Sequence, residues 1–506
     1  MSRTTQSLKN IFTGIGAQLF LTAISFFTTR IIKFSLGFEY LGLNGVFNNI
    51  IAFMSLTELG VGNAIVFALY KPLAENDTQL ISILINFYKK AYRIISLIVF
   101  FIGMIILPFL QLFVNTTLSM NYVRGVFLLF VFNSSASYLL SYKRSIIFAD
   151  QKNYIITLFT LVFSLISRIG QLVIFILTKS YILYLSVNIL CTILLNITIS
   201  IKANKLYPYL KIKIVEKLPD NEKQMLISKI KALFLHSIGT FCIAGTDNIL
   251  ISYFFDVTVV GKYNSYIAIV SIILTLVNQF YDGISSSVGN YLVQKTREEK
   301  YELFKKIEFI NSFITIFITI CLATLLTPFV DWWLGDDSTL TNNVVALIVL
   351  SNFFTLIRKP ISTIKSSAGL FEQDKYAPLI ESFINIVISC ICAHFFGLAG
   401  IIMGTIISAL TVPIWVAPKV VYKYIFERKI FSYFLIILRN LIISILLIIP
   451  LYFIFPHIYL INKTITLIFY FIISITFSLI FEIFIFRKNI YYNDFIKIIK
   501  QKLLNK

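Results

Sequence analysis

A few basic residues interrupt apolar segments of the chain, and their chemistry suits phosphate binding. Arg30 and Lys33 are three positions apart, so they share one face if the segment is helical. Arg168 falls near the middle of the apolar run 154–177, where a charged side chain is costly unless it faces a protein interior or water. Arginine donates paired hydrogen bonds to phosphate. We therefore predict that these three residues line a pocket for a diphosphate; for Arg30 and Lys33 the alternative is snorkelling to the membrane surface.

Three carboxylates also fall inside apolar segments: Glu58, Asp247 and Asp282. Each is interpreted as the counter-charge of a basic residue or as a site for a coupling cation, and Glu58 could also line a solvated cavity. Glu58 is followed by Gly60 and Gly62, which would let the helix bend or pack closely. We predict that Glu58 lies on the cavity side of its helix, beside a glycine hinge, opposite a basic residue.

Motifs for catalysis are missing from the sequence. The three histidines, His236, His394 and His457, form no HExxH motif, and no GxSxG, Walker or dinucleotide fingerprint occurs. Cys390 and Cys392 are two apart, which places them on different faces of a helix. We therefore predict a protein that is not an enzyme, with no catalytic residues, no metal site and no cofactor.

The composition indicates a membrane protein that crosses the bilayer many times. Hydrophobic residues make up 58% of the chain and charged residues 13%, about half the charge of a soluble domain, and mean hydropathy is +0.85. Fourteen segments are long and apolar enough to span a bilayer. They cover approximately 11–32, 41–69, 91–114, 122–142, 154–177, 181–200, 234–255, 260–290, 307–329, 343–363, 377–395, 398–420, 432–456 and 463–486.

The positive charges separate the two sides of the membrane. The amino terminus and the connections after even-numbered spans hold 36 of the 44 Lys and Arg residues. By the positive-inside rule, both termini are predicted to be cytoplasmic. This distribution accounts for the net charge of +20 without nucleic acid as a partner.

Two pairs of similar segments indicate an internal repeat. "FADQKNYIITLF" at Phe148 resembles "LFEQDKYAPLIE" at Leu370, and "YLGLNGVF" around Gly42 resembles "VVGKYNSY" around Gly261. The offsets, 222 and 219 residues, contain six spans, so both copies have the same orientation in the membrane. We therefore predict an all-α protein with two pseudo-symmetric six-helix lobes and two extra C-terminal helices.

The predicted domain boundaries follow from this repeat. They are an N-terminal lobe at 1–200, a basic cytoplasmic linker at 201–233, a C-terminal lobe at 234–425, and the last two spans with a basic tail at 426–506.

Several segments resemble bacterial polysaccharide-unit flippases. "YLGLNGVFNNIIAFMSLTELGVGNAIVFALYKPLAEND", "FYKKAYRII", "TDNILISYFFDVTVVGKYNSYIAIV" and "SSSVGN" are similar to that family. These are Wzx-type transporters for O-antigen (lipopolysaccharide) and capsule units, within the multidrug/oligosaccharidyl-lipid/polysaccharide superfamily. The resemblance covers most of residues 1–425; beyond that only hydropathy matches.

The resemblance implies a flippase of the bacterial inner membrane. Its substrate would be an oligosaccharide joined by a diphosphate to a polyprenol, and polysaccharide polymerase and glycosyltransferases would be its partners. The head group would enter a cationic cavity from the cytoplasm and leave outside by alternating access, while the lipid tail stays in the bilayer beside the last two spans. A proton or sodium gradient would drive the cycle, with Glu58 and Asp247 as candidates for coupling. In the second lobe, Lys262 would be the main candidate for binding the diphosphate.

Other functions remain open at this point. The sequence alone poorly distinguishes a polysaccharide-unit flippase from a lipid II flippase. A multidrug cation antiporter would favour carboxylates over arginines and usually has twelve spans. A membrane-embedded polysaccharide polymerase or ligase would carry a large outer loop with Arg or His, but the longest such connection, residues 330–342, contains neither.

Overall fold

The structure is a computed structural model that describes residues 3–211, 224, 227, 245–458 and 462–492. Every regular element within these ranges is a helix, and none of these residues lies in a strand. The predicted all-α membrane fold is therefore confirmed. The chain divides into two compact units, Met1–Gly261 and Lys262–Lys506, which are described separately.

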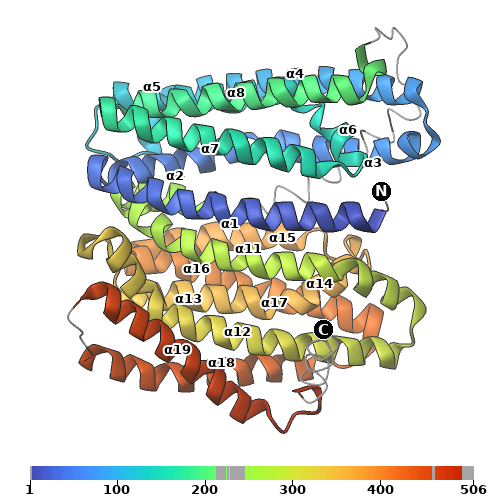
Figure 1. Cartoon of the computed structure of the whole chain (residues 1–506). Helices are drawn as coiled ribbons and strands as arrows, with labels where there is room; N and C mark the ends of the chain where they lie inside the picture. Colours follow the sequence, from blue (N-terminus) through green and yellow to red (C-terminus); the bar gives the residue numbers. More distant parts are fainter. Residues whose placement is uncertain (1–2, 212–223, 225–226, 228–244, 459–461, 493–506) are drawn as a thin grey trace. The chain divides into compact units, whose positions relative to one another are not determined.

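The first unit is built from antiparallel helices that pack around α5 and α8 (Figure 1). Here α4 packs against α5, α5 against α8, α8 against α7, and α7 against α1. Its helices are α1 (Arg3–Leu36), α2 (Phe38–Met54), α3 (Leu56–Glu75), α4 (Thr78–Ile106), η1 (Leu107–Leu112), α5 (Met120–Ser141), α6 (Arg144–Ala149), α7 (Asn153–Thr178), α8 (Tyr181–Leu206), η2 (Pro208–Lys211) and α10 (Asp247–Phe254).

The second unit is organised around α12 and the pair α15 and α16. The helix α11 begins just before the division and continues into this unit. The helices are α11 (Val257–Gln294), α12 (Arg297–Leu334), η3 (Asp336–Ser338), α13 (Asn342–Ile357), α14 (Lys359–Ser367), η4 (Glu372–Asp374), α15 (Ala377–Phe396), α16 (Leu398–Thr411), α17 (Pro413–Val421), η5 (Tyr422–Phe426), α18 (Phe431–Ile454), η6 (Phe455–His457) and α19 (Lys463–Phe486).

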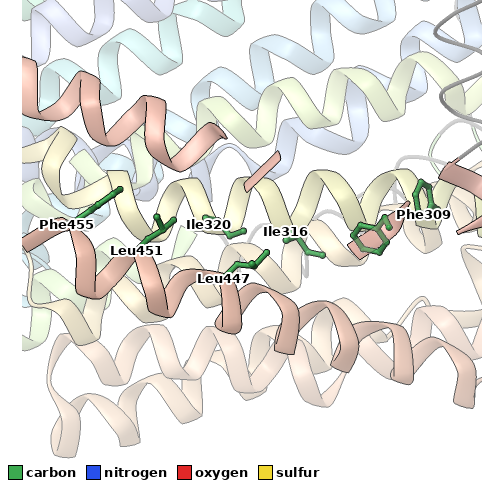
Figure 2. Close-up of a cluster of buried hydrophobic side chains, with 7 residues drawn as sticks. Phe309, Ile316, Ile320, Leu447, Leu451 and Phe455 are labelled. Carbon is green, nitrogen blue, oxygen red and sulfur yellow. The ribbon is translucent and has the colours of Figure 1, made fainter. Parts of the chain in front are cut away.

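The last two long helices, α18 and α19, pack on α12. Figure 2 shows the apolar cluster that joins them, in which Ile316 and Ile320 of α12 face Leu447 and Leu451 of α18. Polar contacts follow the same seam, because the side chains of Asn440 and Glu308 both bond to the Ser312 hydroxyl. Interhelical hydrogen bonds of this kind help to hold helices together in lipid.

Ten helical segments in the described ranges are long and apolar enough to cross a membrane. They coincide with the predicted spans 3, 5, 6 and 8 to 14, although the third span begins earlier, at Thr78 rather than at 91. The predicted spans 1 and 4 are the helices α1 and α5. Of the seventh predicted span, 234–255, most lies outside the described residues.

The second predicted span, 41–69, is broken rather than continuous. The helix α2 ends at Met54 and α3 begins at Leu56. The Ser55 hydroxyl donates a 2.7 Å hydrogen bond to the carbonyl oxygen of Ile51, one turn back. A serine that bonds to the i−4 carbonyl slightly destabilises a helix and often bends it.

The two glycines of the predicted repeat meet where α2 crosses the start of α11. A Cβ atom on Gly42 would lie 1.6 Å from the carbonyl oxygen of Val257. A Cβ atom on Gly261 would lie 2.4 Å from the carbonyl oxygen of Phe38. Only residues without a side chain allow the two backbones to approach this closely.

The predicted domain boundaries stay predictions. Most of the linker beyond residue 211 and the tail from 493 lie outside the described residues. The described part of 201–233 contains the end of α8 and η2.

Candidate functional site

Glu58 occupies the first turn of α3, directly after the break at Ser55. Its backbone N–H donates to the Ser55 carbonyl oxygen at 3.0 Å, which starts the new helix. The break therefore sets the direction in which α3 leaves and, with it, the direction of the Glu58 side chain.

The carboxylate of Glu58 is held by a tyrosine from the neighbouring helix. The Tyr92 hydroxyl on α4 donates a 3.0 Å hydrogen bond to Oε1 of Glu58. One turn along α3, a Cβ atom on Gly62 would lie 3.2 Å from that same oxygen. The absence of a side chain at Gly62 thus leaves room for the carboxylate, and α3 continues unbroken through Gly60 and Gly62. Their role as a hinge stays a prediction.

Glu58 faces a cavity of about 570 Å³ inside the first unit. The cavity wall is mixed, with hydroxyl, amide and phenol groups next to aliphatic side chains. The lining residues are Glu58, Gly62, Val66, Tyr92, Ser137, Tyr138, Ser141, Arg144, Ser145, Phe148, Asn153, Ile156, Thr192, Leu195 and Asn196. A cavity of this size and polarity has room for several waters.

Arg144, at the start of α6, supplies the positive charge of this cavity. It donates a 2.7 Å hydrogen bond through Nη2 to Oδ1 of Asn196 on α8, and the Asn196 amide donates in turn to the carbonyl oxygen of Ser137. The described residues show no ion pair between Glu58 and Arg144. The cavity therefore holds an acid and a base, each bound to a neutral partner.

The sequence alone did not single out Arg144 as a site residue. It was counted with the charged connection after the fourth span, next to Lys143. The structure shows that this connection contains α6, whose Ile146 and Ile147 are fully buried. The apolar run "SIIFA" was the available signal that the segment is a packed helix, because two adjacent isoleucines are uncommon in an exposed loop.

The predicted cations of the first unit lie elsewhere. Arg30 and Lys33 both contact the Phe34 ring, at 5.6 and 4.3 Å from its centroid, in the last turns of α1. Arg168 lies on α7 with its guanidinium close to the Tyr184 hydroxyl of α8. None of the three lines the Glu58 cavity among the described residues.

The remaining predicted residues are also spread along the chain. Asp247 is the first residue of α10, and Lys262 lies in the first turns of α11. Asp282, further along α11, is exposed and close enough to Lys359 to interact electrostatically. The phosphate-binding and ion-coupling roles of all these residues stay predictions.

The second unit also carries a half-buried arginine at a helix break. Arg358 separates α13 from α14 and donates a 2.8 Å hydrogen bond to the carbonyl oxygen of Phe354. Its guanidinium interacts electrostatically with Glu381 of α15 and Tyr433 of α18. Both units thus place an arginine beside a short helix, α6 or α14, that follows the fourth predicted span of its repeat.

The other repeated motif has a structural role. Asp150, after α6, accepts a 2.6 Å hydrogen bond from the Tyr207 hydroxyl and forms an ion pair with Lys152 at 2.6 Å. Burial and this hydrogen bond to Asp150 raise the pKa of Tyr207, so the phenol stays protonated and remains the donor. In the second copy, Asp374 pairs with Lys365 of α14. These contacts hold the helix ends together.

Comparison with solved structures identifies the fold. Lipid II flippase MurJ in an inward closed conformation aligns over 94% of this chain and 99% of its own, with a TM-score of 0.68 and 17% identity. A MATE transporter of Vibrio cholerae, VcmN, aligns over 85% of this chain and 100% of its own, with a TM-score of 0.57 and 14% identity. No protein-family model and no curated protein matches the sequence.

A third similar structure belongs to the same class. It is a transporter of the multidrug/oligosaccharidyl-lipid/polysaccharide superfamily from Pyrococcus furiosus, aligned over 83% of this chain and 95% of its own with a TM-score of 0.54 and 12% identity. At these identities the likeness shows the fold. The chain therefore has the fold of transporters of this superfamily and is a multi-pass membrane protein.

Proposed function

We propose that this protein is a flippase that moves a polyprenyl-diphosphate-linked oligosaccharide from the cytoplasmic to the outer leaflet of the bacterial inner membrane. The observation that carries the proposal is the likeness to lipid II flippase MurJ over 94% of the chain, against 85% and 83% for the two other transporters described above. The longer alignment agrees with the fourteen predicted spans, and the resemblance to polysaccharide-unit flippases supplies the substrate class.

The physical requirement for such a protein is clear. A diphosphate and its sugars are strongly hydrated, and a buried ion costs several kcal/mol even after relaxation of its surroundings. A protein chamber with fixed cations lowers that barrier, and rocking of two helical repeats exposes it to each side in turn. Arg30, Lys33, Arg168 and Lys262 are the proposed diphosphate ligands. Glu58 is the proposed site of coupling to a proton or sodium gradient.

Two related functions compete with this proposal. A lipid II flippase fits the same fold and the same substrate chemistry. A multidrug cation antiporter is favoured by one specific observation, the carboxylate of Glu58 beside the Tyr92 and Tyr138 rings in the 570 Å³ cavity, because such a wall also suits an apolar cation.

Genetic complementation tests the proposal. The chain is expressed in a strain that lacks its polysaccharide-unit flippase, in a strain depleted of its lipid II flippase, and in a drug-sensitive strain. We expect restored surface polysaccharide in the first, and loss of that activity in Arg168→Ala with normal membrane insertion. Lys179→Ala, at the exposed end of the same helix, is the control with the same change of charge. Rescue of only the second or third strain would replace the proposal by the corresponding alternative.

A further inference from the structure

A second, smaller cavity of the first unit lies where the ends of α4, α5 and α8 meet η2. Its volume is about 250 Å³, and its wall includes Lys89 of α4, Lys143 of the α5–α6 turn and Asn204 of α8. Leu210 of η2 closes one side. This cavity shares no lining residue with the Glu58 cavity.

Both charged groups in this wall are cations. The Lys143 ammonium donates to Oγ of Ser200 at 2.9 Å and to Oδ1 of Asn204 at 3.0 Å, which are neutral acceptors. Throughout the described ranges, no carboxylate pairs with Lys89 or Lys143. The two lysines are close enough to repel, since burial and then the charge of Lys89 lower the pKa of Lys143.

A third cation interacts with a residue of the cavity wall. Arg93 follows Lys89 by one helical turn on α4 and interacts electrostatically with Tyr142, which lines the cavity. Like charges held this close are unfavourable by themselves, and an anion bound between them removes the repulsion. The wall also contains amide donors, because Asn86 and Asn204 each carry a side-chain NH₂ group.

Size and position narrow the class of anion. At 250 Å³ the cavity is smaller than typical pockets for drug-sized ligands, so it suits one phosphate group and excludes an oligosaccharide. The cavity lies at the ends of the membrane helices α4 and α8, beside the connections predicted to be cytoplasmic. Basic pockets between membrane helices on that side suit anionic lipid head groups.

We propose that the cavity between Lys89 and Lys143 binds the phosphate group of an anionic phospholipid from the cytoplasmic leaflet. The two ammonium groups neutralise the phosphate, and the side-chain amide of Asn204 donates to its oxygens. Bound lipid then joins the ends of α4, α5 and α8. The site is separate from transport of the substrate and does not depend on which substrate is carried.

Lipid titration of the purified full-length protein tests this site. Phosphatidylglycerol, phosphatidylcholine or inorganic phosphate is added in detergent, and the unfolding midpoint and the lipid retained in native mass spectrometry are measured. Phosphatidylglycerol is expected to stabilise the wild type more than phosphatidylcholine does. In the variant Lys89→Gln with Lys143→Gln, its affinity should fall about tenfold, because each lysine near an anionic head group contributes attraction.

The matched control is Lys90→Gln, which removes the same charge from the exposed neighbouring position of α4 and should leave the affinity unchanged. Lys89→Gln alone leaves the hydrogen bonds of Lys143 intact, so it reports on binding if the double variant is unstable. If inorganic phosphate also raises the unfolding midpoint of the wild type, and does so less in the double variant, the phosphate site is supported. Free phosphate would then be sufficient as a ligand without the lipid. Equal responses of the double variant and Lys90→Gln to phosphatidylglycerol would overturn the proposal.

Discussion

Glu58 shows how a carboxylate is retained among apolar helices. A charged side chain on a membrane helix is unfavourable by about 2.5–3.5 kcal/mol on insertion scales, unless it has polar partners. Here the Tyr92 hydroxyl supplies one hydrogen bond, and Gly62 leaves the space for it. The other side of the carboxylate faces the cavity, whose wall is partly polar. These features account for the retention of the carboxylate, and the proposed coupling role would use the same position.

The first prediction concerns the charge of Glu58. Glu58→Gln keeps the volume and an acceptor for Tyr92, so the unfolding midpoint should stay within a few degrees of wild type. Transport driven by an ion gradient should fall at least about tenfold. This is the factor expected if the variant loses about 1.4 kcal/mol or more of interaction between the carboxylate and the coupling ion. Transport is measured with and without an imposed gradient. Tyr92→Phe, which keeps the charge, should retain more activity than Glu58→Gln.

Gradient-dependent transport at the wild-type rate in Glu58→Gln would contradict a coupling role. The residue would then act only in the packing of α3 against α4.

Sequence reasoning found Glu58 but missed its surroundings. An isolated acid in an apolar run is visible in the sequence, because few residue types are as rare at membrane depth. Arg144 was not visible, because it belongs to a group of basic residues that also marks a loop. Tyr92 gave no signal either, because a tyrosine in an apolar helix is ordinary. Contacts between helices far apart in sequence decide such a site.

At the scale of helices, the repeat carried more information than any single motif. Gly42 and Gly261 were predicted to be equivalent, and the structure places both at the same crossing of α2 and α11. The break at Ser55 was not predicted, because serine is common inside membrane helices and others, such as Ser82 on α4, make the same i−4 bond without interrupting the helix. Helix positions were predicted well because apolar length determines them.

The second prediction concerns this crossing. In Gly42→Ala the new methyl group would lie 1.6 Å from the carbonyl oxygen of Val257, so the helices must separate. Overpacking costs about 1–3 kcal/mol, which lowers the unfolding midpoint. Gly125→Ala is the matched control, since no atom lies within 4 Å of the added carbon on α5. Thermal unfolding of both variants in one detergent makes the comparison, and equal midpoints would show that the close approach is not required.

For the whole molecule, hydropathy and the distribution of charge predicted the helical membrane architecture. The resemblance to polysaccharide-unit flippases predicted the class of transporter. The apolar segments predicted a polytopic helical protein, and the comparison with transporters agrees over nearly the full length. The contact of α18 and α19 with α12 could not be predicted. Both helices carry polar residues on a face that the structure buries, Asn440 and Ser444 on α18 and Ser474, Ser478 and Glu482 on α19. The sequence does not show that this face packs on α12. Ser312 and Asn440, which join α12 to α18, are identified only by the fold.

Reconstitution of the full-length protein in liposomes tests the central claim most directly. A fluorescent polyprenyl-diphosphate oligosaccharide is placed in both leaflets, and a reagent that cannot cross the membrane quenches the outer pool. The account predicts that the wild type makes the inner pool accessible faster than empty liposomes do, and that Arg168→Ala removes this acceleration whereas Lys179→Ala preserves it. An unchanged rate with the wild type, together with movement of a cationic dye through the same liposomes, would contradict the account.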